Sequence, residues 1–409
     1  MAGMRILHTS DWHLGQHFIG KTRLAEHQAF IHWLLEQAES HQADAVLVAG
    51  DIFDTGAPPS YARELYNGLI AQAHRAGVQL VLLGGNHDSV ATLAESRALL
   101  SYLSACVVPA LSEDPAEQVL IFKRRDGEPG ALLCALPYIR PRDVLRSQAG
   151  QSAEQKQQSL QDAIRERYQQ VYEQALRLRE RLGRPLPIIA SGHLTTVGAS
   201  ASESVREIYV GALEAFPSNA FPPADYIALG HIHRPQKVGG HEHIRYSGSP
   251  IPLSFDEAGQ GKEVLLVELD AQGLRGVTPL EVPCFQPLRS VRGSLAQLPA
   301  LLAEAAEAGS AERPVWLEVV VSADDYLSDL AARAQAMCAE LPLELLRVRR
   351  ERGQSASGLA STAGETLAEL TPLDVFERRL ALETLEPPLQ EQLRLRYREI
   401  LASLQEEQA

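Results

Sequence analysis

Residues 5–22 read RILHTSDWHLGQHFIGKT, an apolar, strand-like run followed by two overlapping motifs. Asp11 and His13 form a D-x-H pair of the kind that ligates a metal, whereas residues 15–22 spell G-x-x-x-x-G-K-T, the phosphate-loop pattern of ATPases and GTPases. A phosphate loop follows its strand directly and opens a helix. Here the strand ends near Thr9, several residues before the first glycine, and the variable positions are bulky. The context therefore favours a metal site.

The residues around this stretch alternate between strand-like and helix-like patterns. Strands are predicted at 5–9, 45–49 and 79–83, with helices at 24–41 and 60–76 between them. This order predicts a parallel sheet, whose loops converge at the carboxyl ends of the strands. Later apolar runs predict strands that extend this sheet or form a second one, at 131–136, 187–191, 226–229 and 263–269. The charged segment 153–182 predicts a surface helical insertion.

Polar motifs with metal-ligand chemistry follow several of these strand-like runs. They hold Asp51 in AGDIFD, Asn86 and His87 in GGNHD, His193 in SGH, and His231 and His233 in GHIH. Any one of them is more often an ordinary surface or core residue, but a whole series at the same kind of strand end is hard to explain by chance. Mixed oxygen and nitrogen ligands suit Mn²⁺, and suit Mg²⁺ or Fe²⁺ less well. Asp51 is the natural bridge between two ions about 3.5 to 4 Å apart, a pair that polarises phosphodiesters.

The complete and ordered set of motifs resembles that of the calcineurin-like metallophosphoesterases. Longer stretches such as ILHTSDWHLGQ and GNHDSVATL are similar to the nuclease subunits of bacterial complexes that pair a nuclease with a coiled-coil ATPase. The resemblance implies an α/β fold: a β-sandwich flanked by helices, followed by a small α+β capping domain and a C-terminal helical hairpin.

The resemblance also implies roles for particular residues. One Mn²⁺ would be held by Asp11, His13, Asp51 and His233, and the other by Asp51, Asn86, His193 and His231. His87 would contact the scissile phosphate and help the leaving oxygen depart. Asp88 would orient the His87 ring, or would only stabilise the turn. The archaeal and eukaryotic members of the family usually have histidine at the position of Asp54, so a second catalytic histidine is not implied here.

The expected domain organisation is a nuclease domain at 1–281, a capping, DNA-binding domain at 282–350, a linker at 351–366 and a partner-docking helical segment at 367–409. The two amphipathic helices between 371 and 404 need a cover for their apolar faces, either the body of the protein or another chain. A basic run near the end of the capping domain is a candidate contact to a DNA backbone or a solvated run: Arg347, Arg349, Arg350 and Arg352.

Composition limits the other possibilities. The net charge of −14 argues against a generally basic, nucleic-acid-binding surface. The cysteines are scattered without a C-x-x-C pair, so neither a disulfide framework nor a zinc knuckle is indicated: Cys106, Cys134, Cys284 and Cys338. No apolar run is long enough for a membrane span, and the scattered cysteines fit a reducing, cytoplasmic setting. The resemblance to DNA nucleases adds the expectation that the protein is nucleoid-associated.

The expected function is that of a metal-dependent DNA nuclease: a 3′–5′ exonuclease on double-stranded ends and an endonuclease on hairpins and single strands. The resemblance implies work with a coiled-coil ATPase in DNA repair, recombination and replication, as a homodimer within a heterotetramer. A phosphatase of a small molecule or protein, and an inactive docking scaffold, are the alternatives. The complete ligand set counts against the scaffold, and the C-terminal helices count against a stand-alone phosphatase.

Deleting residues 367–409 is expected to spare Mn²⁺-dependent cleavage by the isolated chain, because the last predicted ligand is His233. The same deletion is expected to prevent association with the ATPase. Co-purification of the two chains and a cleavage assay on the truncated chain measure the two effects. Complex formation by the truncated chain would contradict the docking role.

Overall fold

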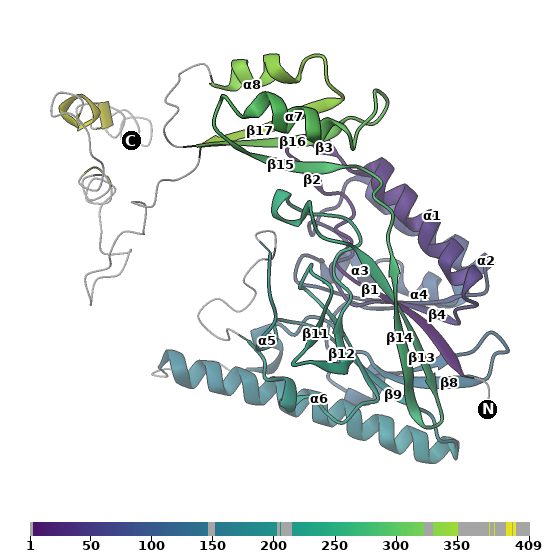
Figure 1. The fold of residues 1–409 in the computed structure, drawn as a ribbon. Coiled ribbons are helices and arrows are strands. Elements are labelled where there is room, and N and C mark those ends of the chain that lie inside the picture. Colours follow the sequence, from purple (N-terminus) through teal and green to yellow (C-terminus); the bar gives the residue numbers. More distant parts are fainter. Residues whose placement is uncertain are drawn as a thin grey trace.

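The computed structural model describes residues 3–145, 152–202, 205, 215–322 and 330–350, and beyond them only positions 376, 380, 390–394, 396 and 397. The predicted linker, most of the predicted C-terminal helices and Arg352 therefore lie outside the described residues. The described part of the chain is built around two six-stranded sheets and one three-stranded sheet, with the three-stranded sheet at the top of Figure 1.

The first sheet contains the strands that carry the first motifs. Strands β1, β4, β5 and β6 run parallel, β13 runs antiparallel beside β1, and β14 runs antiparallel beside β13. Residues 45–48, with the sequence AVLV, form the strand β4, which is buried along its whole length, as central parallel strands are. The spatial order is β14 (Gly273–Glu281), β13 (Glu263–Asp270), β1 (Met4–Thr9), β4 (Ala45–Val48), β5 (Gln79–Leu83) and β6 (Ala105–Val108).

The second sheet contains three of the later apolar runs. Strands β12, β10, β9 and β8 run parallel, with the antiparallel strands β11 and β7 at the two edges. The run at 263–269 lies instead in the first sheet, as β13. The later apolar runs therefore both extend the first sheet and form a second one. The order is β11 (Gln236–Val238), β12 (His241–Tyr246), β10 (Tyr226–Gly230), β9 (Ile188–His193), β8 (Pro129–Cys134) and β7 (Val119–Lys123).

The two sheets pack face to face. Side chains from both, including Ile6, Leu47, Leu133 and Ala228, form one buried cluster between them. Helices α1 (Leu24–Ser40) and α2 (Ser60–Arg75) cover the outer face of the first sheet, and α6 (Ala153–Leu182) covers the second (Figure 1). This helix–sheet–sheet–helix arrangement confirms the predicted sandwich flanked by helices.

Helix α6 matches the predicted helical segment in extent and packs closely on the sandwich. It begins with a capping box between Ser152 and Gln155, which satisfies free amides at its first turn. Leu160, Ile164 and Tyr168 recur at a spacing of four residues and are fully buried against the second sheet. Burial of each such side chain contributes roughly 1.5 to 3 kcal/mol.

Among the helices in the described ranges, none combines the length and apolarity that crossing a bilayer requires.

A smaller α+β unit follows the sandwich. Its three parallel strands are β15 (Leu288–Gly293), β16 (Val315–Val321) and β17 (Leu343–Arg350), and α7 (Leu298–Ala306) and α8 (Leu330–Cys338) cover one face around a core of its own. On the other face, Leu288 and Trp316 pack against Phe18 and Phe255 of the sandwich part. The small sheet is therefore docked directly onto the larger unit.

The apparent phosphate loop forms a β-hairpin. Strands β2 (His17–Phe18) and β3 (Lys21–Thr22) pair across a turn in which Ile19 and Gly20 have φ values of 49° and 81°. Both positive values are those of a tight hairpin turn. The Phe18 ring stacks on Trp316 with 5.8 Å between centroids, and Lys21 forms an ion pair with Glu344. These motif residues therefore bind the small α+β unit and do not form a phosphate cradle, in agreement with the expected metal-site interpretation.

Replacing Lys21 by alanine is expected to leave activity intact and to remove no ATP binding from the isolated chain, because its ammonium faces Glu344. The pair is about one-third exposed, so stability should fall by less than about 1 kcal/mol. Phe18→Ala is the contrasting variant, with an expected loss nearer 3 kcal/mol because the ring is buried. Calorimetric titration with ATP and urea unfolding measure both effects. ATP binding that disappears in Lys21→Ala would restore the phosphate-loop interpretation.

Candidate metal centre

The loops after β1 and β4 are joined by main-chain hydrogen bonds. The Asp11 amide donates to the Gly50 carbonyl at 3.0 Å, and the amides of Trp12 and His13 both donate to the Asp51 carbonyl, at 2.9 and 3.1 Å. These bonds fix the D-x-H motif against Asp51, although the two lie in different strand-end loops. The predicted convergence of these motifs at the carboxyl ends of parallel strands is present in the structure.

Four of the predicted ligands have left-handed backbone conformations. The φ values are 54° at Asp11, 48° at His13, 49° at Asp51 and 94° at His231. Such a conformation costs a residue other than glycine on the order of 1 to 3 kcal/mol, and it persists where the surroundings enforce it. The strain is concentrated on the residues predicted to hold metal. Close packing also explains Gly85, because a Cβ there would lie 2.1 Å from Asp51 Oδ1.

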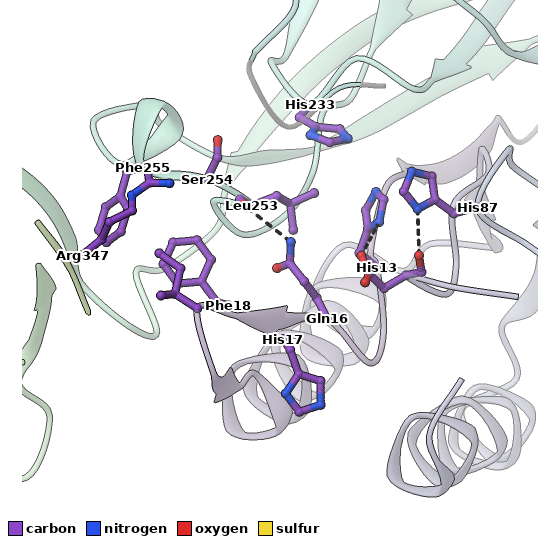
Figure 2. Close-up of a pocket in the computed structure, with 12 residues that line it drawn as sticks. His13, Gln16, His17, Phe18, His87, His233, Leu253, Ser254, Phe255 and Arg347 are labelled. Atoms are coloured by element: carbon purple, nitrogen blue, oxygen red, sulfur yellow. Dashed lines mark hydrogen bonds and ion pairs between the residues drawn. The ribbon is translucent and has the colours of Figure 1, made fainter. Parts of the chain in front are cut away.

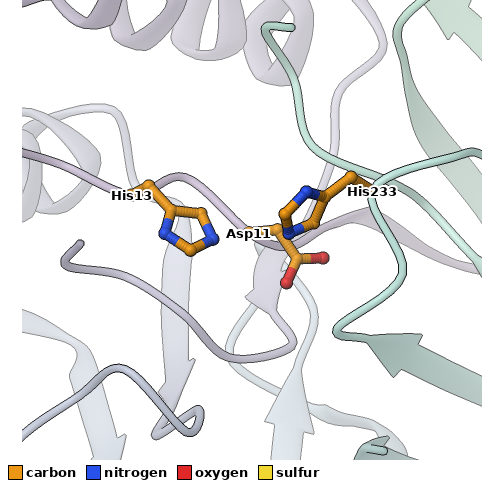
Figure 3. A group of neighbouring side chains, drawn as sticks. All are labelled: Asp11, His13 and His233. Carbon is orange, nitrogen blue, oxygen red and sulfur yellow. The ribbon is translucent and has the colours of Figure 1, made fainter. Parts of the chain in front are cut away.

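Asp11, His13 and His233 form the first cluster, in which each residue offers a ligand atom within 4.8 Å of the others (Figure 3). The Asp11 carboxylate accepts hydrogen bonds from Ser10 Oγ at 2.6 Å and from the His231 amide at 2.9 Å. His13 Nε2 is buried and has no hydrogen-bond partner among the residues described. A held carboxylate beside an unpaired imidazole nitrogen fits a divalent cation.

Asp51, His193 and His231 form the second cluster. His193 Nδ1 donates to the Ala49 carbonyl at 2.9 Å, which leaves Nε2 as the ligand atom, and Asn86 Oδ1 lies 2.9 Å from that Nε2. His231 Nε2 is a further buried nitrogen without a partner in the described part of the chain. The structure thus brings Asn86 and both histidines to the same place as Asp51.

The Asp51 carboxylate faces both clusters. Its Oδ2 lies 3.6 Å from His13 Nε2 and 3.3 Å from His193 Nε2. Its Oδ1 accepts the His87 amide at 2.9 Å, so the carboxylate cannot turn freely. This geometry supports the bridging role predicted for Asp51.

The charges of the site control its protonation. Burial alone would lower the pKa of His13 and of His193, but neighbouring carboxylates outweigh it. The pKa of His13 is raised, chiefly by Asp54 and Asp51, and that of His193 is raised to about 9 by Asp51. Burial lowers the pKa of His231 well below its usual value, and the His193 charge adds to this effect. A cation at His193 therefore competes with a proton for the ring.

His87 lies beside His13, with 4.6 Å between ring centroids (Figure 2). Its Nδ1 donates to the main-chain carbonyl of Asp54 at 2.7 Å. The Asp88 carboxylate instead accepts the amides of Phe53, Ile52 and Gly85 at 2.9, 3.1 and 2.8 Å. These contacts support the turn-stabilising alternative for Asp88, which ties the GDIFD loop to the GGNHD loop.

Two carboxylates that the motifs did not identify as functional contact Nδ1 of predicted ligand histidines. Asp54 Oδ1 lies 3.1 Å from His13 Nδ1, and Glu257 Oε1 lies 3.2 Å from His233 Nδ1. Burial would raise the pKa of Glu257, but the hydrogen bond to His233 and the charge of buried Lys262 hold it well below its usual range. Glu257 lies in a short 3-10 helix and not directly after a strand, so the strand-end pattern does not identify it.

A cleft of about 380 Å³ opens beside the first cluster, between the sandwich and the small α+β unit. Arg347 of β17 reaches this cleft, with its guanidinium 5.4 Å from the centroid of the Phe255 ring (Figure 2). Arg347 and Arg349 both form ion pairs with Glu318, at 2.6 and 2.8 Å. The cleft is lined by His13, Gln16, His17, Phe18, Ile19, Asp54, His87, His233, Leu253, Ser254, Phe255 and Arg347.

Asp51→Ala is expected to lower metal occupancy at both clusters, because it removes the oxygen that faces both of them. It should also abolish metal-dependent phosphodiester cleavage. Elemental analysis after dialysis against Mn²⁺ measures the occupancy, with circular dichroism to confirm folding. Full occupancy in the folded variant would refute the bridge.

Comparison with known proteins agrees with this geometry. Residues 4–235 match the family model for calcineurin-like phosphoesterases, and residues 284–384 match the model described as the type 5 capsule protein repressor C-terminal domain. The SbcD subunit of the nuclease SbcCD of Escherichia coli (strain K12) is 55% identical over 390 residues, which cover 95% of this chain and 96% of that protein. The corresponding protein of Rhodobacter capsulatus is 33% identical over 389 residues (91% and 93% covered), and that of Bacillus subtilis is 32% identical over 270 residues (65% and 66% covered). The phosphoesterase match and the ligand clusters together imply binding of divalent metal. The chain belongs to the SbcD family of calcineurin-like phosphoesterases.

Proposed function

We propose that this chain is a metal-dependent DNA nuclease, with 3′–5′ exonuclease activity on double-stranded ends and endonuclease activity on hairpins and single strands. The observation that carries the proposal is the position of Asp51 Oδ2 between two clusters of oxygen and nitrogen ligands. The relatives at 55% and 33% identity are named as nuclease subunits, which supports DNA as the substrate. The proposed ions are two Mn²⁺, which this ligand mixture suits better than Mg²⁺ or Fe²⁺.

When bound, two such ions would supply Lewis acidity to a phosphodiester and would lower the pKa of water. The chain supplies the proton for the leaving oxygen. Because His87 Nδ1 donates to the Asp54 carbonyl, Nε2 is the atom that can hold and release the transferable proton. The same contact fixes the ring in the cleft wall beside His13.

The cleft beside the first cluster is the proposed path of the DNA strand, with the capping domain at 282–350 as one wall. Since the chain carries a net charge of −14, attraction for a DNA backbone has to be local. Arg347 offers such a charge at the cleft, although Glu318 offsets part of it. A phosphate could compete for Arg347 with Glu318, which would make this contact dependent on salt.

The proposed partner is an SbcC-type coiled-coil ATPase, which would dock on residues 367–409. A homodimer within a heterotetramer is also proposed. Leu99 and Tyr102, at the surface around helix α4 (Arg97–Leu100), are 62% and 81% exposed, and adjacent exposed apolar side chains of this size often mark an interface. The proposed setting is DNA repair, recombination and replication at the nucleoid.

The direct test is incubation of the purified chain with Mn²⁺ and either linear duplex DNA or a chromogenic phosphomonoester. End-labelled duplexes report the strand polarity. The proposal predicts cleavage of the duplex from its 3′ ends and little turnover of the monoester. Rapid turnover of the monoester without DNA cleavage would favour the phosphatase alternative.

His87→Gln is expected to keep both metals and DNA binding but to slow hydrolysis by roughly two to four orders of magnitude, the usual contribution of a positioned proton donor. Glutamine can still donate a hydrogen bond, but it cannot release a proton at neutral pH. Single-turnover cleavage, alongside metal analysis, separates the two roles. Loss of metal would make His87 a ligand, and an unchanged rate would leave leaving-group protonation to water.

A further inference from the structure

The two clusters differ in the groups that contact Nδ1 of their histidines, the ring nitrogen that is not the proposed ligand atom. In the first, both rings have a carboxylate near Nδ1: Asp54 is 3.1 Å from His13, and Glu257 is 3.2 Å from His233. In the second, His193 Nδ1 donates to the main-chain carbonyl of Ala49 at 2.9 Å. A carboxylate carries a full negative charge, whereas a carbonyl carries a partial one.

This difference matters because an imidazole that donates its second N–H to a carboxylate is both better oriented and more basic at its ligand nitrogen. The direct ligands add to the same asymmetry. Besides shared Asp51, the proposed first site has a second carboxylate, Asp11, whereas the second site has the neutral amide of Asn86. Two independent features therefore favour tighter cation binding at the first site.

We propose that Asp54 and Glu257 are positioning residues that make the Asp11–His13–His233 site the high-affinity site, so that it fills first and the Asn86–His193–His231 site holds the exchangeable ion. This inference rests on the proposed dinuclear site. It also gives Asp54 a role that requires no second catalytic histidine.

Glu257 holds His233 through a buried network. Glu257 is fully buried, and its Oε2 accepts hydrogen bonds from Lys262 Nζ at 2.6 Å and from the Leu253 amide at 3.0 Å. Lys262 Nζ also donates to the His233 carbonyl at 3.1 Å, so both the ring and the main chain of His233 are held. Replacing Glu257 would leave the buried Lys262 ammonium without its counter-charge, which would destabilise the folded protein.

Asp54 is the better residue to test. Its side chain is 25% exposed, and its contacts to His13 and to His87 come from different atoms. The carboxylate faces the metal ligand His13, whereas the main-chain carbonyl accepts from His87 Nδ1 at 2.7 Å. A side-chain substitution therefore removes the contact to His13 and leaves the contact to His87 in place.

The experiment titrates Mn²⁺ into the metal-free full-length chain and follows binding by calorimetry and electron paramagnetic resonance, which distinguishes an isolated ion from a coupled pair. The wild-type chain is expected to bind one equivalent before the second. Asp54→Ala should weaken the first step by about 10 to 100-fold, the usual effect of losing such a partner. The amide oxygen of Asp54→Asn can still accept a hydrogen bond from His13, so its affinity for the first Mn²⁺ should lie between those of the wild-type chain and Asp54→Ala.

Two further variants serve as controls. Glu36→Gln alters an exposed carboxylate 3.2 Å from His32 Nε2, the same type of pair outside the site, and should leave both steps unchanged. Asn86→Ala should weaken only the second step. At saturating Mn²⁺, Asp54→Ala should regain a kcat close to that of the wild-type chain, because the His87 contact is intact; a general structural defect would not be rescued in this way.

An unchanged first step in Asp54→Ala, equal affinities of the two sites in the wild-type chain, or failure of Mn²⁺ to restore kcat would each overturn the inference. Uptake of fewer than two ions by the wild-type chain is a different result. It would refute the dinuclear site itself, and the proposed order of filling with it.

Discussion

The main-chain carbonyl of Asp51 accepts the amides of Trp12 and His13, and its carboxylate accepts the amide of His87. One residue therefore joins the loops that follow β1, β4 and β5. With Oδ1 held in this way, Oδ2 is fixed between the ligand nitrogens of His13 and His193. Other predicted ligands contact the same loop, because the Asp11 amide donates to the Gly50 carbonyl and His193 Nδ1 donates to the Ala49 carbonyl.

This arrangement has an energetic cost that the surrounding hydrogen bonds offset. The left-handed conformations of Asp11, His13 and Asp51 are unfavourable one at a time, yet each lies in a segment whose amides are paired. Nε2 of His13 and Nε2 of His231 are buried and have no hydrogen-bond partner among the described residues. The site is thus pre-organised around positions that a cation would satisfy, and little rearrangement is needed when one binds.

The strands that carry the motifs could be predicted because central parallel strands read as continuous apolar runs, as at 45–48. The strand-end rule then placed Asp11, Asp51 and Asn86 at one edge. Apolar runs do not reveal which sheet a strand joins, so the division between the two sheets needed the structure. The β2–β3 hairpin has strands of two residues, too short for a periodic pattern, and Glu257 meets His233 through a loop contact that no local motif announces.

The central claim is that Asp51 bridges two ions, and anomalous diffraction from a crystal soaked in Mn²⁺ tests it most directly. The account predicts two anomalous peaks on either side of Asp51 Oδ2, about 3.5 to 4 Å apart. One peak should lie beside Asp11, His13 and His233, and the other beside Asn86, His193 and His231. A single peak, or two peaks that Asp51 does not share, would contradict it.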